Sequence, residues 1–449
     1  MFSLIGFDTA AVSAVRIGNT DALVVARSSE ATEVLVMPGT RGGRVEVITD
    51  EGSTFAASSF EVDPPPPMTP LTQRARVATS DQVGQAGFGS SVALSADGQT
   101  LAAGAYKDAN WVGAAWVFRL EADGGWVPKT PKLADGTTRG ASGCQGYSVA
   151  LNATGSLVTV GGHCDTGASW TYARQPDGTW RIRGARIDGL AADAHWEAMS
   201  LATSAAGTTL LRSSASEGVA AARVLSPSAS GWETPGTLLA ADAGFFTAAV
   251  GLSADGNVAL VSGTPRTPST AYAWVFHRVD GVWQQPGQAL FGTDLTDAVA
   301  GHTRAALSGD GSTAVLLALR SVPGTTRRAA SAWVFRRAAD GTWRPEGGQI
   351  DVPGMRLGSE PQGLAVDFVG GRFLVVGAGP NGDQVKVAQY LRGDGGWAGQ
   401  GEALSLGAAG LDPNQIGPTV AISLDGATVV VGVASDNGNR GAVYVLRAD

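Results

Sequence analysis

Aspartates that recur at one place in a repeated pattern are the first side chains to consider for chemistry. Asp97, Asp255, Asp310 and Asp425 each stand directly before a glycine. A ring of carboxylates could serve as acids and bases. However, Asp-Gly is typical of a hairpin turn, in which the aspartate bonds to nearby backbone and the glycine adopts a positive φ. We therefore interpret these aspartates as turn residues and assign no catalytic residue.

Two tryptophans stand outside any repeated position and are candidates for ligand contact. Trp111 lies in the segment KDANWVG, and Trp196 follows His195 in AADAHWEAM. Aromatic side chains on loops bind sugars and proteins by stacking and by burying a large area. We name Trp111, His195 and Trp196 as ligand-contact candidates. The alternative is that these loop residues fold back on the protein.

The two cysteines predict a disulfide. Cys144 and Cys164 flank a hairpin whose turn centres near Thr154, so we expect them to face each other across two strands, at a distance that a disulfide can span. Two buried free thiols are the alternative. A disulfide would indicate an oxidising compartment. Asn152, in the same turn, begins the glycosylation sequence Asn-Ala-Thr at an expected exposed tip.

The sequence predicts no metal site and no cofactor. Cys164 stands beside His163 but is assigned to the disulfide. No phosphate-binding, dinucleotide-binding or nucleophile motif occurs in the strand-turn-helix context that it requires. The histidines fall in different copies of the repeat, and no pair has metal-ligand spacing. They are His163, His195, His277 and His302.

Seven copies of a pattern of strands and turns organise most of the chain. Residues 91–126 contain three apolar runs and two Asp-Gly turns, followed by a run that begins with Trp126. The glycine of the first turn recurs every 49 to 60 residues. Four short strands at this period predict the blades of a seven-bladed β-propeller. The repeated glycines are Gly98, Gly155, Gly207, Gly256, Gly311, Gly371 and Gly426.

Ten tryptophans recur within these copies, and we interpret them as packing between blades. Six follow the second turn: Trp126, Trp180, Trp232, Trp283, Trp343 and Trp397. Four lie in the third strand: Trp116, Trp170, Trp274 and Trp333.

The ends of the repeat region predict how the propeller closes. The seventh copy stops at Asp449 after its third strand, whereas residues 69–80 occupy the place of a fourth strand before the first copy. We expect this strand to complete the last blade, which leaves no open sheet edge. The predicted domains are a partial sandwich at 1–62, a proline-rich linker at 63–68 and a propeller at 69–449.

The copies resemble the FG-GAP-like repeats of large secreted and surface proteins. The segment FGSSVALSADGQTLAAGA, residues 88–105, carries the resemblance most clearly, together with the seventh copy. The resemblance covers almost all of residues 69–449 and implies a propeller. Integrin-type repeats carry a D-x-D-x-D-G calcium loop, and no copy here has one. The nearest segment, 436–439, offers too few carboxylates, so no calcium site is assigned.

Residues 1–62 resemble the later two-thirds of an IPT/TIG domain, which is an immunoglobulin-like β-sandwich. Five short strand-like runs carry the resemblance: VSAVRIG, ALVVARS, TEVLVMPG, GGRVEVITDEG and SFEV. The usual opening strands of the family are missing. The sandwich is therefore expected to be partial: either the chain belongs to a larger polypeptide, or another segment completes the sandwich.

Composition narrows the classes of function. The net charge of −8 provides no basic surface for nucleic acid. No apolar run approaches the ~20 residues of a membrane span. The start of the chain has no basic residues before an apolar core and does not resemble a signal peptide.

We expect a non-catalytic extracellular or cell-surface module for adhesion or assembly, which binds a protein or glycan through propeller loops, including as a subunit of a surface appendage. Two alternatives stay open. A glycan hydrolase or lyase would need a carboxylate pair about 5–10 Å apart in the propeller funnel. An intracellular scaffold would be favoured by reduced cysteines.

Overall fold

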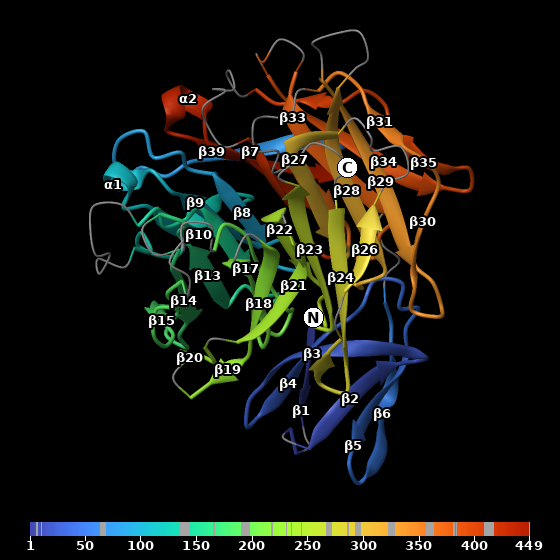
Figure 1. Cartoon of the computed structure of the whole chain (residues 1–449). Helices are drawn as coiled ribbons and strands as arrows, with labels where there is room; N and C mark the ends of the chain where they lie inside the picture. Colours follow the sequence, from blue (N-terminus) through green and yellow to red (C-terminus); the bar gives the residue numbers. More distant parts are fainter. Residues whose placement is uncertain are drawn as a thin grey trace.

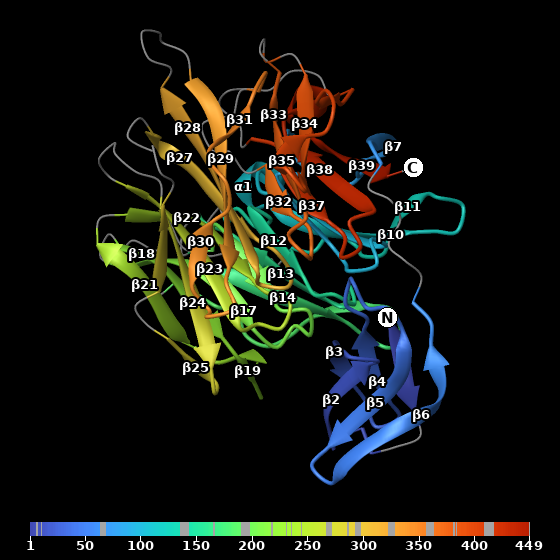
Figure 2. The same cartoon turned by 90° about the vertical axis from the view of Figure 1, so that its right-hand side faces the viewer.

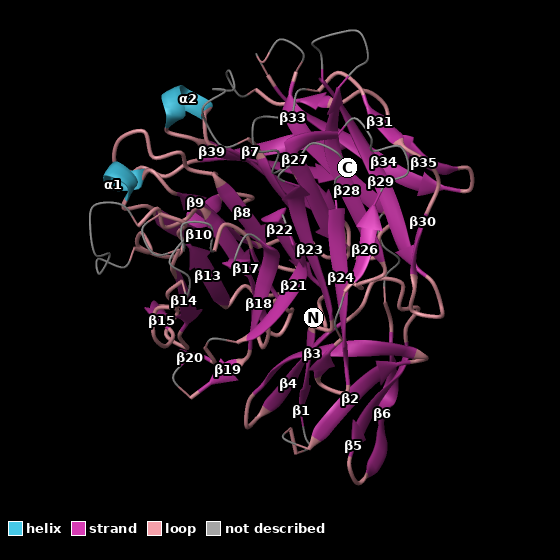
Figure 3. Cartoon of the chain, in the orientation of Figure 1, coloured by secondary structure: helices cyan, strands magenta, loops and turns pink. Residues whose placement is uncertain are grey.

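Among the described residues, the regular secondary structure is almost entirely β-strand. The computed structural model describes the chain except for residues 6–7, 10, 63–68, 135–142, 165–166, 190–197, 217–218, 230, 235, 244, 266–271, 285–286, 292–297, 322–327, 356–362, 380–381, 383, 408–416 and 449. The described helices are α1 (Asp108–Trp111) and α2 (Asp436–Asn439), four residues each (Figure 3). Within the described residues, no helix is long and apolar enough to cross a membrane. The predicted all-β class is confirmed.

Within the described residues after 70, the strands form seven sheets of four or five strands, plus a two-stranded sheet. The first two are β8 (Ser91–Leu94), β9 (Thr100–Ala105), β10 (Ala114–Leu120), β11 (Trp126–Pro128), and β12 (Ser148–Leu151), β13 (Leu157–Gly161), β14 (Ser169–Arg174), β15 (Trp180–Ile182). The third and fourth are β16 (Leu201–Thr203), β17 (Leu210–Ser216), β18 (Val219–Leu225), β21 (Thr237–Ala243), and β22 (Phe245–Leu252), β23 (Val258–Pro265), β24 (Tyr272–Val279), β25 (Val282–Trp283), β26 (Gln288–Phe291).

The fifth and sixth sheets are β27 (Ala298–Leu307), β28 (Thr313–Ser321), β29 (Arg328–Arg337), β30 (Trp343–Pro345), β31 (Ile350–Val352), and β32 (Leu364–Val366), β33 (Arg372–Ala378), β34 (Val385–Gly393), β35 (Gly396–Gly399), β36 (Leu404–Ser405). The seventh is β37 (Thr419–Ile422), β38 (Thr428–Val433), β39 (Ala442–Ala448) and β7 (Leu71–Val77). The two-stranded sheet is β19 (Pro227–Ser228) and β20 (Gly231–Trp232).

These sheets succeed one another around a closed ring. The inner strands β8, β12, β16, β22, β27, β32 and β37 contact each other in chain order, and β37 returns to contact β8. Buried apolar clusters lie between neighbouring sheets; one joins Trp116 and Phe88 to Val430 and Val443 of the last sheet. This cyclic arrangement of small antiparallel sheets is a β-propeller.

The third copy departs from the predicted pattern. Its outer strand is β21, while Trp232 lies in β20 and pairs with β19. The prediction that Trp232 leads a fourth strand was therefore wrong for this copy. Its indole is still buried, and its Nε1 donates to Thr171 of the preceding sheet at 2.9 Å. The packing role predicted for this tryptophan holds although its strand differs.

The turns after the inner strands bond to one another around one mouth of the ring. In four of these turns an aspartate accepts a bond from the amide two residues later, as at Asp97 and Gln99 (3.0 Å), which confirms the turn role predicted for the aspartates. Backbone bonds then join turn to turn. They run from the amides of residues 96, 153, 205, 254, 310 and 424 to the carbonyls of residues 153, 205, 254, 309, 368 and 96.

The last sheet combines both ends of the propeller region. β7 pairs with β39 in antiparallel register, from Val77 opposite Val443 to Leu71 opposite Ala448. This is the place that the incomplete seventh copy leaves for a fourth strand. Arg76 of β7 donates to Asp436 at 2.6 and 2.9 Å, and the Asp436 side chain is 7% exposed.

Residues 1–60 form a separate six-stranded sheet. Its strands, β1 (Phe2–Ile5), β2 (Val12–Ile17), β3 (Thr20–Arg27), β4 (Ala31–Leu35), β5 (Gly43–Thr49) and β6 (Gly52–Phe60), are ordered β1-β4-β3-β2-β5-β6. The rings of Phe2 and Phe60, on the two edge strands, lie 4.6 Å apart, so the sheet folds around its own apolar core. The sequence did not predict β1, and placed the last strand later than β6.

This N-terminal sheet covers the mouth that the turns surround (Figure 2). Leu23 and Val25 of β3 and Leu35 of β4 form one apolar cluster with residues of the turns. The turn residues in this cluster are Ala96, Ala153, Ala205, Ala254 and Leu424. Small apolar residues at the second turn position therefore provide the surface on which the N-terminal sheet packs.

Replacing Arg76 tests the closing contact. Arg76→Ala leaves the buried Asp436 carboxylate with fewer donors, so we expect the free energy of unfolding in urea to fall by about 1–3 kcal/mol. Arg16→Ala removes the exposed Arg16–Asp21 pair and is the control, with a clearly smaller expected loss because solvent screens an exposed ion pair. Equal losses in the two variants would contradict the role given to Arg76.

Glycine substitutions test the contact between turns and neighbouring sheets. Gly98 has φ +66°, and a Cβ there would meet the Thr428 Oγ1 of the adjacent sheet at 2.8 Å. Gly124 has φ +84°, with open space around a Cβ. We expect Gly124→Ala to cost about 1–2 kcal/mol from the backbone alone, and Gly98→Ala a further 1–3 kcal/mol, roughly, from overpacking. Thermal unfolding of the two variants would show whether this difference exists.

Candidate functional site

The mouth opposite the N-terminal sheet carries the candidate site. β9 begins near the covered mouth, just after the turn at Gly98, and ends at Ala105 on the far side, where α1 follows. Figure 1 shows α1 and α2 remote from the N-terminal sheet. We call residues 107–113 the mouth loop.

The mouth loop contains a left-handed turn, and two of its residues are of types that disfavour positive φ. Ala109, Asn110 and Trp111 have φ of 49°, 59° and 71°. The corresponding turn of the last sheet has Asn437, Gly438 and Asn439 at φ of 50°, 65° and 68°. Asparagine and glycine tolerate this conformation, whereas alanine and tryptophan raise its energy by roughly 1–2 kcal/mol each. The mouth loop therefore holds Trp111 at an energetic cost that the equivalent loop avoids.

A buried carboxylate fixes the base of the mouth loop. Asp108 is fully buried, its Oδ1 accepts from the Val83 amide at 2.6 Å, and its Oδ2 pairs with the Lys132 ammonium. The Gly113 amide donates to the Asp108 carbonyl at 2.9 Å, which closes the turn. These contacts tie the loop to two other segments. They explain how a strained turn can persist.

Trp111 is the exposed member of an aromatic cluster. Its side chain is 41% exposed and meets the Tyr106 ring edge to face at 5.5 Å between centroids. Tyr106 in turn meets Tyr147 at 5.6 Å, and Tyr147 lies 3.9 Å from the His163 ring. The Lys107 Nζ stands 5.0 Å from the Trp111 centroid. The cluster thus presents one indole and one ammonium group to a ligand, with rings beneath them.

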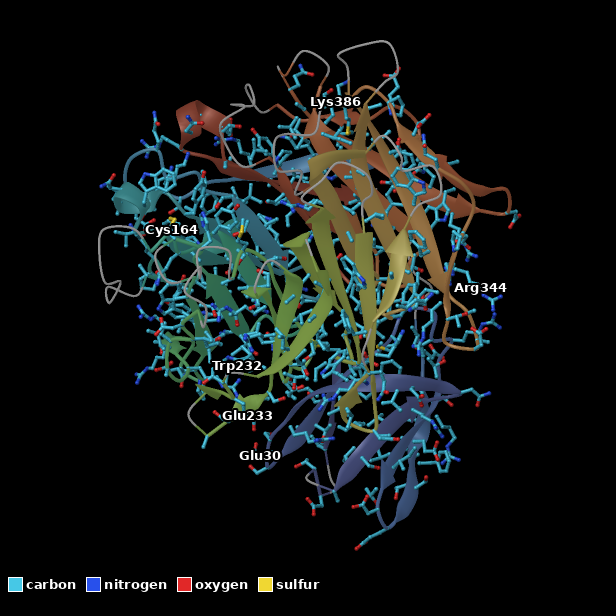
Figure 4. The ribbon with its side chains drawn as sticks, viewed as in Figure 1. Glu30, Cys164, Trp232, Glu233, Arg344 and Lys386 are labelled. Atoms are coloured by element: carbon cyan, nitrogen blue, oxygen red, sulfur yellow. A yellow bond between two sulfur atoms is a disulfide. The ribbon has the colours of Figure 1, made fainter. Side chains whose placement is uncertain are left out.

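The predicted disulfide is present and braces this cluster. Cys144 and Cys164 are bonded, with their Cα atoms 5.4 Å apart, and Cys164 lies on the side of the ring that carries α1 (Figure 4). They do not face each other from paired strand residues as expected, because β12 and β13 span only 148–151 and 157–161. The Cys144 amide donates to the Trp111 carbonyl at 2.8 Å. The disulfide therefore holds the segment that supports Trp111.

The expected exposure of Asn152 is wrong. Its side chain is 4% exposed, because its Oδ1 accepts from the amides of Ser156 and Leu157, both at 2.9 Å. Its Nδ2 donates to the hydroxyls of Thr154 and Ser156. The amide that would carry a glycan is thus engaged inside the turn. His195 and Trp196, the other two contact candidates, lie outside the described residues.

A cavity of about 350 Å³ occupies the centre of the ring. Arg304 is its charged lining residue, and Tyr147 connects it to the aromatic cluster. Among the described residues that line it, none is a carboxylate, so the acid pair required by the glycosidase alternative is not assembled from them. The lining is otherwise mostly small or aliphatic and comes from the inner strands: Ala202, Val250, Leu252, Ala305, Leu307, Val366 and Ile422.

A second hollow lies at the third sheet. It measures about 570 Å³ and is lined by Val224, Trp232, Glu233 and Thr237 among others. Figure 4 places Trp232 and Glu233 far from Cys164 and nearer the N-terminal sheet. This hollow is therefore separate from the mouth loop. Sequence reasoning did not single out Glu233, since a lone glutamate after a repeated tryptophan gives no signal.

Comparison with known proteins supports the fold. The FG-GAP repeat profile matches residues 71–118, which run from the start of β7 into β10. No curated protein matches the chain. A chain of hydrazine synthase from Kuenenia stuttgartiensis is 13% identical, with a TM-score of 0.54, and the match covers 84% of this chain and 99% of that one. At this identity the likeness shows the fold alone.

Two weaker structural matches are also found. The periplasmic gluconolactonase PpgL from Pseudomonas aeruginosa is 16% identical, with a TM-score of 0.46 and coverage of 89% of this chain and 96% of that one. The Dos1 propeller is 11% identical, with a TM-score of 0.46 and coverage of 80% and 78%. Residues 71–118 therefore match an FG-GAP repeat, and the ring of sheets described above is a β-propeller.

Replacing Asn152 tests its structural role. Asn152→Ala leaves two amides of the turn without their side-chain acceptor, so we expect the free energy of unfolding to fall by about 2–4 kcal/mol. Asp177 accepts similar bonds from Thr179 in an exposed turn, and Asp177→Ala should cost clearly less than Asn152→Ala because water can replace its bonds. Peptide mapping of the folded chain should find Asn152 without a glycan. An occupied Asn152 would contradict its burial.

Proposed function

We propose that this protein is a non-catalytic binding module at the cell surface or outside the cell, which engages a protein or glycan through the mouth loop. The observation that carries this proposal is Trp111, which is exposed on a left-handed turn that costs energy and is braced by a buried aspartate and a disulfide. Folding alone gives no reason for tryptophan there, because the matching turn of the last sheet uses Asn439.

The covered mouth indicates from which side of the ring a partner would bind. The N-terminal sheet packs on the turns at one side of the ring, so a partner has access to the other side, where Trp111 and Lys107 lie. A disulfide and an FG-GAP repeat are consistent with an extracellular or periplasmic location. We further propose that each of the seven sheets is one blade, that the N-terminal sheet is a partial IPT/TIG domain, and that the chain belongs to a larger surface polypeptide.

The glycan-processing enzyme is the second candidate. The central cavity, with Arg304 and Tyr147 in its lining, offers space for a small substrate. Its described lining has no acid for a general acid-base reaction, which is why we place this function second. An Arg304→Ala variant that loses a measured hydrolase or lyase activity, while Trp111→Ala keeps it, would reverse this order. The intracellular scaffold is a third hypothesis, which isolation of the native chain with reduced cysteines would favour.

Replacing Trp111 tests the proposed function. The purified chain is applied to an array of neutral and acidic oligosaccharides and, in parallel, to immobilised surface proteins of its source organism. Trp111→Ala should weaken the strongest signal at least tenfold, about 1.4 kcal/mol or more, because an exposed tryptophan commonly dominates such contacts. Asn439→Ala, at the equivalent position of the turn in the last sheet's copy of the repeat, should bind like the unchanged chain. Equal binding by all three proteins would refute the role of the mouth loop.

A further inference from the structure

Three side chains with metal-binding atoms meet beside the mouth loop. Cys144, His163 and Cys164 each place one ligating atom within 4.8 Å of the others, and no other group of this kind is found among the described residues. In the oxidised chain the two sulfurs are bonded to each other. We propose that reduction of this disulfide creates a binding site for a soft divalent metal ion, held by two thiolates and the His163 imidazole.

Reduction of the disulfide and binding of the metal involve no protein groups beyond these three side chains. A phosphine reductant and one water molecule convert the disulfide into two thiols, and the phosphine leaves as its oxide with the oxygen of the water. Each thiol then loses one proton as its sulfur binds the metal, so two protons are released per ion. Metal binding should therefore weaken as the pH falls.

Cys164 and His163 already stand near the separation that two ligands of a tetrahedral ion require. The Cys164 Sγ lies 3.9 Å from the His163 Nδ1 and 3.8 Å from its Nε2. Zinc bonds of ≈ 2.3 Å to sulfur and ≈ 2.0 Å to nitrogen imply roughly 3.5–3.8 Å between tetrahedral ligands. Opening the disulfide by rotation of the two cysteine side chains would bring both sulfurs into this range. Three protein ligands would leave one position for water.

The backbone keeps the three ligands together after the disulfide is broken. On one side, the amides of Cys144 and Gln145 donate to the carbonyls of Trp111 and Val112 at 2.8 and 3.1 Å. On the other side, the Gly162 amide donates to the Ala168 carbonyl at 2.8 Å and closes the loop that carries His163. Neither set of bonds depends on the sulfur atoms. In the reduced chain these bonds would therefore keep the segments that carry the three side chains close to one another.

The surroundings favour a divalent ion bound by sulfur. Cys144 is fully buried in an apolar cluster with Tyr106 and Tyr147, against which Cys164 and Met199 pack. Two thiolates neutralise the charge of a divalent cation, which lowers the cost of placing it in such poorly hydrated surroundings. Thiolate and imidazole ligands select zinc-like ions over calcium or magnesium. The cluster that supports Trp111 would then be held by a metal in place of the disulfide.

Cadmium titration of the reduced chain tests the site, because cadmium thiolates absorb in the near ultraviolet. The folded chain, treated with a phosphine, should bind one Cd²⁺ with this absorption, and the oxidised chain should not. His163→Ala should weaken binding at least tenfold. His277→Ala replaces a histidine in a distant sheet and should bind like the unchanged chain. Added Zn²⁺ should compete with the bound Cd²⁺ for the site.

Three outcomes would overturn the proposal. Equal affinity of His163→Ala and the unchanged chain would mean that the thiols alone bind the metal. Absence of the absorption in the reduced, folded chain would mean that the ligands do not converge. Loss of the near-ultraviolet circular dichroism on reduction would mean that the backbone does not hold the site without the disulfide.

Discussion

Hydrogen bonds from turn to turn around one mouth are the constraint on which the propeller depends. Each of these backbone bonds joins neighbouring sheets, so a change in one turn affects its neighbours. The bonds require a tight turn, and the Ser-x-Asp-Gly pattern supplies it with a side-chain acceptor and a positive φ. The same ring of turns offers a flat apolar surface to Leu23, Val25 and Leu35. One repeated sequence feature thus links neighbouring sheets and seats the N-terminal sheet.

The two mouths of the ring differ in how regular their turns are. At the covered mouth, repeated residues make nearly equivalent turns, and small side chains allow close packing. At the other mouth, the corresponding loops differ in sequence, and the mouth loop carries a tryptophan in a conformation that suits asparagine or glycine. Burial raises the pKa of Tyr444, whose hydroxyl donates to Asp436 at 3.1 Å. Specific function is therefore expected where repetition ends.

The sequence predicted the features that depend on local chemistry. The Asp-Gly turns, the all-β class and the cysteine pair follow from residue types and spacing, and the structure has each of them. The buried state of Asn152 could not be predicted, because it depends on hydroxyl groups that fold back within one turn. The cluster of His163 with both cysteines was also missed. His163 and Cys164 are adjacent in sequence, but their approach to Cys144 depends on how two loops meet in space. The pairing of β19 with β20 was likewise missed, because it depends on tertiary packing.

The pairing of β7 with β39 has a consequence for synthesis of the chain. Partners in this sheet, such as Thr72 and Arg447, are 375 residues apart. At ≈ 5–20 residues per second, the ribosome needs roughly 20–75 s to make the partner of a strand that it has already released. During that time β7 has an unpaired edge, and the first sheet has no neighbour on one side, which exposes strands to aggregation. The charged residues Arg74 and Arg76 on β7 would limit such contacts while the strand waits for its partner.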